Sequence, residues 1–166
     1  MPVPVGNSLF EHLMSTLPYR KNVAVFVVDQ AGNLLGCERS DRTGAWQIPQ
    51  GGVEEGEDLL EAMLRELEEE IGTRCVDVID ALTDPIRYDW PPHLHSRGFA
   101  GQEQYYFLVR LTVDTQIDLA RATTNEFQCT EWMTCAEFLS RVQGFKSEAY
   151  AEALRLFRSR HPEKIR

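Results

Sequence analysis

Three glutamates at helical spacing dominate the middle of this 166-residue chain. Glu66, Glu69 and Glu70 stand at positions i, i+3 and i+4, which places all three carboxylates on one face of an α-helix. Neighbouring negative charges repel one another and weaken a helix unless a cation offsets them. A hard divalent cation with oxygen ligands supplies that charge, so the spacing predicts a metal-binding helix rather than an ordinary acidic, solvent-exposed face.

The residues around these glutamates favour a helix with one buried face. Apolar residues recur at spacings of four, three and four, as in a stripe that packs against a core; they are Leu60, Leu64, Leu67 and Ile71. Gly72 follows the last of them, where a helix commonly ends. Residues 49–52, Pro-Gln-Gly-Gly, form a loop with little side-chain bulk, so the Gly51 carbonyl is a candidate additional metal ligand.

From residue 51 to residue 73 the chain resembles the Nudix box, G-x5-E-x7-R-E-U-x-E-E-x-G-U, where U is a bulky aliphatic residue. The fixed positions are matched by Gly51, Glu57, Arg65, Glu66, Glu69, Glu70 and Gly72. Only the last position departs, because Thr73 replaces an aliphatic residue, and we expect this to affect packing rather than chemistry. The resemblance implies a hydrolase of phosphoanhydride bonds.

The same resemblance assigns roles within the box. It implies that Glu66, Glu69 and Glu70 bind the metal and serve catalysis, with Mg2+ as the cofactor and Mn2+ as the alternative. It also implies a structural ion pair between Arg65 and Glu57 that holds the loop and the helix together.

The rest of the chain alternates strands and helices without linkers or repeats. Residues 23–28 form a continuous apolar run typical of a buried strand, and residues 34–37 return as its hairpin partner. Further strands are predicted over residues 76–79 and 105–111, and residues 131–133 are predicted to end one more. Thr134 to Glu137 is a capping box for a short helix, and Ser147 is predicted to cap a last helix that runs to about residue 158.

This order of elements indicates an α/β fold, an α/β/α sandwich with a mixed central sheet, which is also the architecture that the Nudix resemblance implies. We expect an N-terminal extension over residues 1–18 and a single Nudix domain over residues 19–166.

The net charge, the apolar runs and the cysteines limit which partners and which cellular location we expect for the protein. The net charge of −9 argues against a protein that binds nucleic acid non-specifically along its phosphates, although a phosphorylated end can still be recognised. No apolar run approaches 18 residues, and the first residues show no secretory signal, so we expect no membrane association. Four scattered cysteines without metal-ligand spacing are expected to be reduced thiols in the cytoplasm.

Segments outside the box narrow the substrate. Residues 19–23, 46–52, 101–108 and 144–146, in this order, resemble one branch of the Nudix family. That branch contains bacterial RNA pyrophosphohydrolases and plant-type diadenosine tetraphosphate hydrolases. The similarity extends from about residue 19 to residue 157.

These segments supply six candidate substrate-binding residues. They are Arg20, Arg39, Gln102, Gln104, Phe145 and Lys146. Guanidinium groups clamp phosphates and stack on bases, an aromatic ring stacks on a base, and amides bond to a base edge or sugar. The plain alternatives are surface salt bridges for the arginines, a core position for Phe145, and exposed strand positions without a role for the glutamines.

Glu126 is our candidate for a fourth metal ligand or for the general base, since the related enzymes carry a glutamate before a phenylalanine-like residue on this loop. Asn125 departs from the proline common in that branch, and Glu103 is the rival candidate for the base. His93 and His95, two residues apart beside prolines, are interpreted as part of a substrate-side loop rather than as metal ligands.

Three functions remain open at this point. The favoured one is a metal-dependent RNA 5′-pyrophosphohydrolase, which converts 5′-triphosphate or diphosphate ends to monophosphates and so initiates RNA decay. The alternative is hydrolysis of dinucleoside polyphosphates such as diadenosine tetraphosphate, which residues 88–99 with their Tyr-Asp-Trp-Pro-Pro string resemble. The third is an inactive nucleotide sensor, whose expected mark, a missing catalytic glutamate, is not found. The sequence assigns no oligomeric state.

Overall fold

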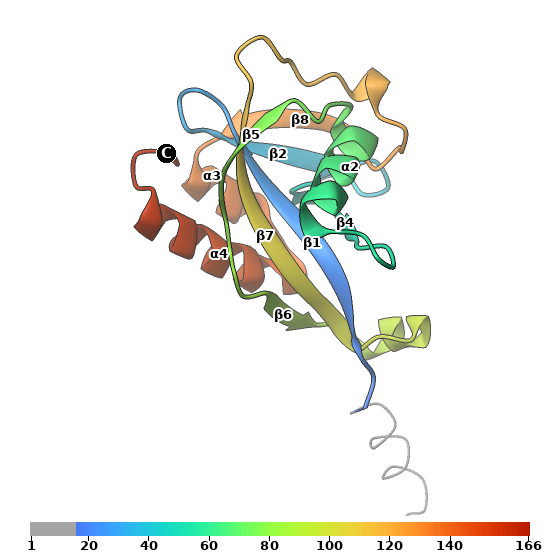
Figure 1. Ribbon diagram of the computed structural model, residues 1–166. Helices are drawn as coiled ribbons and strands as arrows, with labels where there is room; N and C mark the ends of the chain where they lie inside the picture. The colour runs from blue at the N-terminus through green and yellow to red at the C-terminus, as the bar shows by residue number, and fades with distance from the viewer. Residues whose placement is uncertain (1–15) are drawn as a thin grey trace, which may run out of the picture.

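A mixed sheet with helices on both faces forms the body of the protein (Figure 1). The computed structural model describes residues 16–166, so most of the predicted extension over residues 1–18 lies outside the described part. The sheet has eight strands: β1 (Tyr19–Val28), β2 (Leu34–Arg39), β3 (Trp46–Gln47), β4 (Gln50–Gly52), β5 (Val76–Ala81), β6 (Ile86–Asp89), β7 (Gly101–Leu111) and β8 (Phe127–Met133). The helices are α2 (Leu59–Ile71), α3 (Cys135–Arg141) and α4 (Ser147–Arg160), with the 3-10 turns η1 (Pro92–Arg97), η2 (Leu119–Arg121) and η3 (Gly144–Lys146).

The sheet is built around one parallel pair. Its main order is β3-β2-β1-β7-β5, with β4 beside β1, β6 beside β7 and β8 beside β2. Strands β1 and β7 run parallel over their whole length, and every other pairing is antiparallel. The predicted α/β sandwich with a mixed sheet is therefore confirmed.

Strand β1 separates two cores. Its alternate residues Val23, Val25 and Val27 pack with α2, while Ala24 and Phe26 pack with α3 and α4 on the other face. Successive side chains of a strand point to opposite faces, so a strand covered on both sides needs apolar residues at every position. This explains why the run reads as continuously apolar.

Helix α2 has well-defined ends. The Asp58 side chain accepts hydrogen bonds from the backbone N–H groups of Leu60 and Glu61 at 2.7 and 3.2 Å, as an N-cap residue does. At the other end Gly72 has φ 77°, a left-handed conformation that glycine adopts without a steric penalty.

The buried face of α2 differs from the predicted stripe. Leu60 is 43% exposed, so its assignment to the core was wrong. The buried residues of the helix are Ala62, Met63, Glu66, Leu67, Glu70 and Ile71. The leucine spacing predicted a buried face that is rotated from the observed one, because the observed face includes the polar residues Glu66 and Glu70.

The helices on the other face agree with the sequence apart from one cap. Thr134 and Glu137 form the predicted capping box at the start of α3. Ser147 does not cap α4 as predicted, because it is the first helical residue and its hydroxyl donates to the Gly144 carbonyl at 2.9 Å. The preceding turn η3 positions the start of α4 instead.

The structure also describes the state of the cysteines and the character of the helices. The four cysteines are all unpaired thiols, two of them buried. Within residues 16–166 no helix combines the length and apolar character needed to cross a membrane.

Candidate active site

A cavity of about 600 Å³ opens between the start of β1, the β4 loop and helix α2. Segments from most of the chain contribute to its wall. The lining residues are Arg20, Asn22, Arg39, Gln50, Gly51, Gly52, Glu66, Glu70, Tyr88, Trp90, Leu94, Arg97, Gln102, Glu126, Phe145 and Lys146. Most of the predicted site residues therefore meet at one place.

Glu66 and Glu70 form the acidic wall of this cavity. Both residues are buried on α2, whereas Glu69 is half-exposed at the edge of the helix. Burial raises the pKa of the Glu66 carboxyl, and burial together with the Glu66 charge raises the pKa of Glu70 well above its usual range. Two desolvated carboxylates close together are unfavourable in isolation, so this wall is suited to binding cations.

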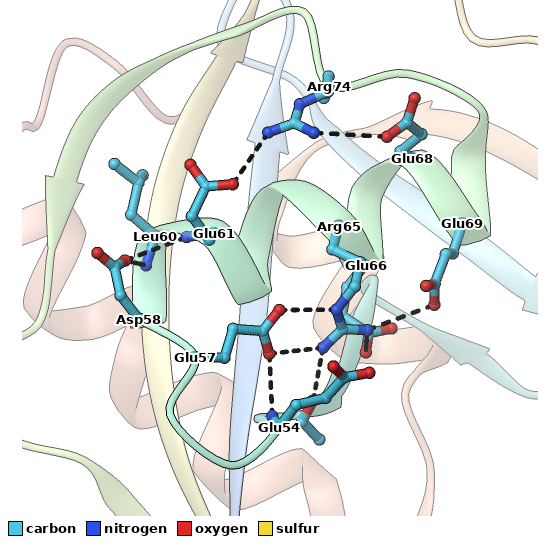
Figure 2. Close-up of polar contacts among 11 residues, drawn as sticks. Glu54, Glu57, Asp58, Leu60, Glu61, Arg65, Glu66, Glu68, Glu69 and Arg74 are labelled. Carbon is cyan, nitrogen blue, oxygen red and sulfur yellow. Dashed lines mark hydrogen bonds and ion pairs between the residues drawn. The ribbon is translucent and has the colours of Figure 1, made fainter.

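Arg65 connects the loop before α2 with the acidic wall (Figure 2). Its Nε and Nη2 donate to the two oxygens of Glu57 at 2.8 and 2.9 Å, which is the predicted ion pair. Nη2 also donates to the Gly52 carbonyl, and Nη1 lies 2.7 Å from a Glu66 oxygen and 3.5 Å from Glu69. Arg65 thus offsets part of the negative charge of the helix face, in addition to the structural role predicted for it.

The loop packs tightly against the carboxylates. A Cβ atom on Gly51 would lie 2.0 Å from the carboxyl carbon of Glu66, so only glycine allows this approach. The backbone N–H of Gln50 donates to Glu70 Oε2 at 3.1 Å and holds that carboxylate against the loop.

The donor set around this wall fits a hard divalent cation. Carboxylate oxygens and a backbone carbonyl are the ligands that Mg2+ and Ca2+ prefer, and the cavity wall offers Glu66, Glu70, Glu126 and Gly51. Glu69 lies just outside the lining and is held by Arg65. Among the described residues no three acidic, histidine or cysteine side chains form a ready ligand cluster, so ligation requires carboxylate rotation.

The two candidates for the general base differ in position. Glu126 lines the cavity, and its charge acts on Glu70 and Lys146. Glu103 lies on the opposite face of β7 from Gln102 and forms an ion pair with Arg87 at 3.0 Å. The geometry therefore favours Glu126.

Four cationic side chains line the cavity with the acidic wall: Arg20, Arg39, Arg97 and Lys146. The Arg20 guanidinium lies over Gly52, where a Cβ atom would be 2.3 Å from Nη2. Arg39 is held by a bidentate pair with Asp41 at 2.8 and 2.6 Å. Lys146 donates to Gln47 Oε1 at 3.2 Å, and burial lowers the pKa of its ammonium group to about 8.

An aromatic pair borders the cavity on the side of α4. Phe145 is 42% exposed, and its ring centroid lies 5.7 Å from that of Tyr88. A large exposed ring at a cavity mouth is available for stacking, so the alternative of a core position for Phe145 was wrong.

Gln102 and Gln104 are both buried, so the alternative that they occupy exposed strand positions was wrong. Gln102 is 6% exposed and lines the cavity, while Gln104 is fully buried and lies behind the lining. The Gln104 side chain bonds to Asn22, Gln50 and Gln102, so its polar atoms are engaged within the protein. Gln104 therefore has no direct access to a ligand in the cavity.

Several lining residues were missed by the sequence reading. These are Asn22, Tyr88, Trp90, Leu94 and Arg97. Asn22 could have been found, since it follows Arg20 by two residues and shares its face of the strand. Turn η1 brings Leu94 and Arg97 to the cavity, and His95 Nε2 anchors this turn at 2.9 Å from the Trp90 carbonyl. His93 does not line the cavity.

Comparison with known proteins agrees with this site. The NUDIX domain profile matches residues 18–156. A Helicobacter pylori protein named RNA pyrophosphohydrolase is 39% identical over 146 residues, which cover 84% of this chain and 94% of the relative. A protein of the same name from Erythrobacter litoralis is 38% identical over 152 residues, covering 86% and 93%.

The chain therefore belongs to the Nudix family, as its box predicted, and with this the expected hydrolase of phosphoanhydride bonds is confirmed. Enzymes of this kind use divalent metal ions. Solved structures share the fold: Escherichia coli dihydroneopterin triphosphate pyrophosphohydrolase aligns with a TM-score of 0.65 at 22% identity, covering 82% of this chain and 96% of that one. A Caenorhabditis elegans Ap4A hydrolase aligns with a TM-score of 0.62 at 17% identity, covering 84% and 98%.

Proposed function

We propose that this protein is a Mg2+-dependent RNA 5′-pyrophosphohydrolase, which converts 5′-triphosphate or diphosphate ends to monophosphates and so prepares RNA for decay. The observation that carries the proposal is the composition of a single cavity. Two buried carboxylates, four cationic side chains and an exposed aromatic ring line it together. This combination suits a ligand with a phosphate chain at one end and a nucleoside at the other.

Metal binding in this proposal uses the residues of the acidic wall. Glu66, Glu69, Glu70, Glu126 and the Gly51 carbonyl would hold Mg2+, with Mn2+ as a substitute. The bound cation supplies positive charge to the diphosphate oxygens and acidifies a water molecule. Since the buried carboxylates have raised pKa values, cation binding also relieves their mutual repulsion.

The chain's own groups position the substrate and move one proton. Arg20, Arg39 and Lys146 contact phosphate oxygens and balance the charge that develops as the phosphoanhydride bond breaks. Glu126 accepts the proton of the attacking water, whose oxygen forms the new bond to phosphorus while pyrophosphate or phosphate leaves. Phe145 stacks on a base near the 5′ end.

The alternative substrate is a dinucleoside polyphosphate. The relatives named RNA pyrophosphohydrolase support the RNA proposal, because they cover most of this chain at 35–39% identity. The Ap4A hydrolase aligns at only 17% identity and supports the shared fold. An inactive nucleotide sensor is disfavoured, since every box glutamate is present. We infer that the enzyme works in the cytoplasm, where new RNA 5′ ends are available in bacteria.

A paired turnover assay in Mg2+ tests the proposal. Wild-type protein and Glu70→Gln are each given 5′-triphosphorylated RNA and diadenosine tetraphosphate at matched concentrations. We expect kcat/KM to favour the RNA by about tenfold or more, equal to about 1.4 kcal/mol of transition-state discrimination. A preference of that size for the dinucleotide would instead assign the enzyme to nucleotide hydrolysis.

A further inference from the structure

A chain of buried side-chain hydrogen bonds lies behind the catalytic cavity, with Gln104 at its centre. Gln104 pairs with Asn22 in the parallel register of β1 and β7. Its Nε2 donates to Asn22 Oδ1 at 2.9 Å and to Gln50 Oε1 at 3.0 Å, and Gln102 Oε1 lies at 3.4 Å. One amide nitrogen thus faces the carbonyl oxygens of three other amides.

Three tyrosine hydroxyls fix which end of each amide in this hydrogen-bond network is the oxygen. Tyr106 Oη donates to Gln104 Oε1, Tyr150 Oη donates to Gln50 Oε1 at 3.0 Å, and Tyr88 Oη donates to Gln102 Oε1. Burial raises the pKa of each of these three phenols, so all of them remain protonated donors. Each hydroxyl donates its proton to an amide oxygen. The oxygens of Gln50 and Gln102 therefore face the tyrosines, and their NH2 groups lie on the opposite side of each amide.

The oxygen ends of the amides of Asn22, Gln50 and Gln102 accept hydrogen bonds inside the protein. Asn22, Gln50 and Gln102 all line the cavity, whereas Gln104 does not. The hydrogen bonds of these three side chains to Gln104 all use the amide oxygens, and none uses an NH2 group of Asn22, Gln50 or Gln102. An amide NH2 group that faces a cavity can donate two hydrogen bonds, so the arrangement suits a ligand rich in acceptor oxygens.

We propose that Gln104 is a positioning residue that turns the amide donors of Asn22 and Gln102, with that of Gln50, towards the phosphate oxygens of the substrate. The inference rests on the proposed function and deepens it, because it names neutral donors in addition to the cationic side chains of the cavity. Neutral donors fit the geometry of a phosphate chain without adding positive charge that would compete with the metal. In the opposite orientation, the amide oxygens would face the phosphates and repel them.

Substitution of Gln104 tests this orientation directly. In Gln104→Glu the carboxylate accepts only, so the three neighbouring amides rotate their NH2 groups towards it and present oxygens to the cavity. We expect KM for the substrate that wild type cleaves, and Kd for inorganic pyrophosphate in Mg2+, to rise about tenfold or more. The value of kcat should stay within about threefold, because the metal-binding glutamates and Glu126 are untouched.

Two matched variants separate orientation from packing and charge. Gln104→Met keeps the length of the side chain but imposes no orientation, so we expect a smaller rise of about threefold in both constants. Gln116→Glu adds the same charge on an exposed loop beyond β7 and should leave both constants unchanged. Equal effects of the Glu and Met variants, or an unchanged pyrophosphate Kd in Gln104→Glu, would overturn the proposal.

A measurement on the wild type keeps the test independent of variant folding. Titration with pyrophosphate in Mg2+, followed by NMR of the side-chain amides, should shift the NH2 signals of Asn22 and Gln102. If these signals stay in place while pyrophosphate binds, the donors do not face the ligand and the inference is wrong. Failure to cleave RNA would count against the proposed function alone, because pyrophosphate binding does not depend on it.

Discussion

Arg65 and Glu57 form a bidentate ion pair, in which Arg65 Nε donates to Glu57 Oε1 at 2.8 Å and Nη2 donates to Oε2 at 2.9 Å. The pair links the loop before α2 to the middle of the helix, and both side chains are largely shielded, with exposed fractions of 25% and 14%. Charge-assisted bidentate pairs of this kind are geometrically demanding, because a lysine cannot reproduce the fork. The loop that carries Gly51 and Gly52 therefore depends on this contact.

Loss of the fork should destabilise the protein. We expect Arg65→Lys to lower the free energy of unfolding by about 1–3 kcal/mol, since a shielded charged hydrogen-bond pair is lost. Urea denaturation followed by circular dichroism measures the change. Arg74→Lys is the control, because Arg74 binds Glu61 and Glu68 on the exposed side of α2 and should have little effect. Equal changes in the two variants would contradict this role of Arg65.

The same pair predicts a dependence of stability on acid. The hydrogen bonds from Arg65 lower the pKa of Glu57 from 4.5 to about 2. Because the folded pKa is lowered, the stabilisation is present above pH 4.5 and is lost as pH falls from about 4.5 to about 2. The difference in unfolding free energy between wild type and Glu57→Gln should therefore shrink across this window. A constant difference from pH 6 to pH 2 would show that the pair does not titrate in this way.

Activity and stability should separate at Glu70. Glu70→Gln keeps an acceptor for the Gln50 N–H but removes a buried charge with a raised pKa. We expect the metal-free variant to be more stable than wild type, because the amide removes a desolvated carboxylate whose pKa is raised well above its usual range. Its kcat/KM should fall about a thousandfold or more, and its melting temperature should respond less to Mg2+. Wild-type turnover in this variant would refute the metal role of α2.

Substitutions of Gly51 and Gly52 should change different kinetic constants. A Cβ atom on Gly51 meets the Glu66 carboxyl at 2.0 Å, and one on Gly52 meets Arg20 Nη2 at 2.3 Å. We expect Gly51→Ala to lower kcat and raise the Mg2+ concentration for half-maximal activity, because it displaces a metal ligand. Gly52→Ala should chiefly raise KM, because it displaces a phosphate-binding cation. Steady-state kinetics with varied Mg2+ separates the two, and identical profiles would argue against these assignments.

Phe145 should contribute to binding but not to folding. Its ring is 42% exposed, so Phe145→Ala should leave the melting temperature nearly unchanged. Loss of a base-stacking ring costs about 1–3 kcal/mol, so we expect kcat/KM for RNA to fall about 5- to 150-fold. Phe145→Tyr retains the ring and should restore activity. If the alanine variant cleaves RNA like wild type, the ring does not stack on the substrate.

Local patterns in the sequence were sufficient to predict the acidic helix α2. The spacing of Glu66, Glu69 and Glu70 fixes their common face through the 3.6-residue helical period, and Asp58 and Gly72 mark the ends through cap chemistry. The predicted ion pair of Arg65 with Glu57 joins residues only eight positions apart. Strand β1 was likewise predictable, because an unbroken apolar run fits only a strand covered on both faces.

Exposure and side-chain direction were harder to predict. Leu60 fits a helical stripe in the sequence, yet it faces solvent because the loop and sheet cover a neighbouring face of α2. The glutamines of β7 fit exposed strand positions in the sequence, but Gln104 lies between Asn22 of β1 and Ile86 of β6 and is fully buried. Polar residues gain their role from the partners that pairing places beside them, and those partners are distant in the sequence.

The sequence by itself determined the chemistry of this protein, whereas the tertiary structure decided which groups work together. Helical periodicity and a short motif specify the acidic face of α2, since both act over a few turns of one element. The assembly of Arg20, Glu70, Glu126 and Lys146 around one cavity follows from the sheet register and the packing of α2 and η3. Burial of Lys146 and the orientation of the amides around Gln104 arise from the same long-range contacts, which no local pattern encodes.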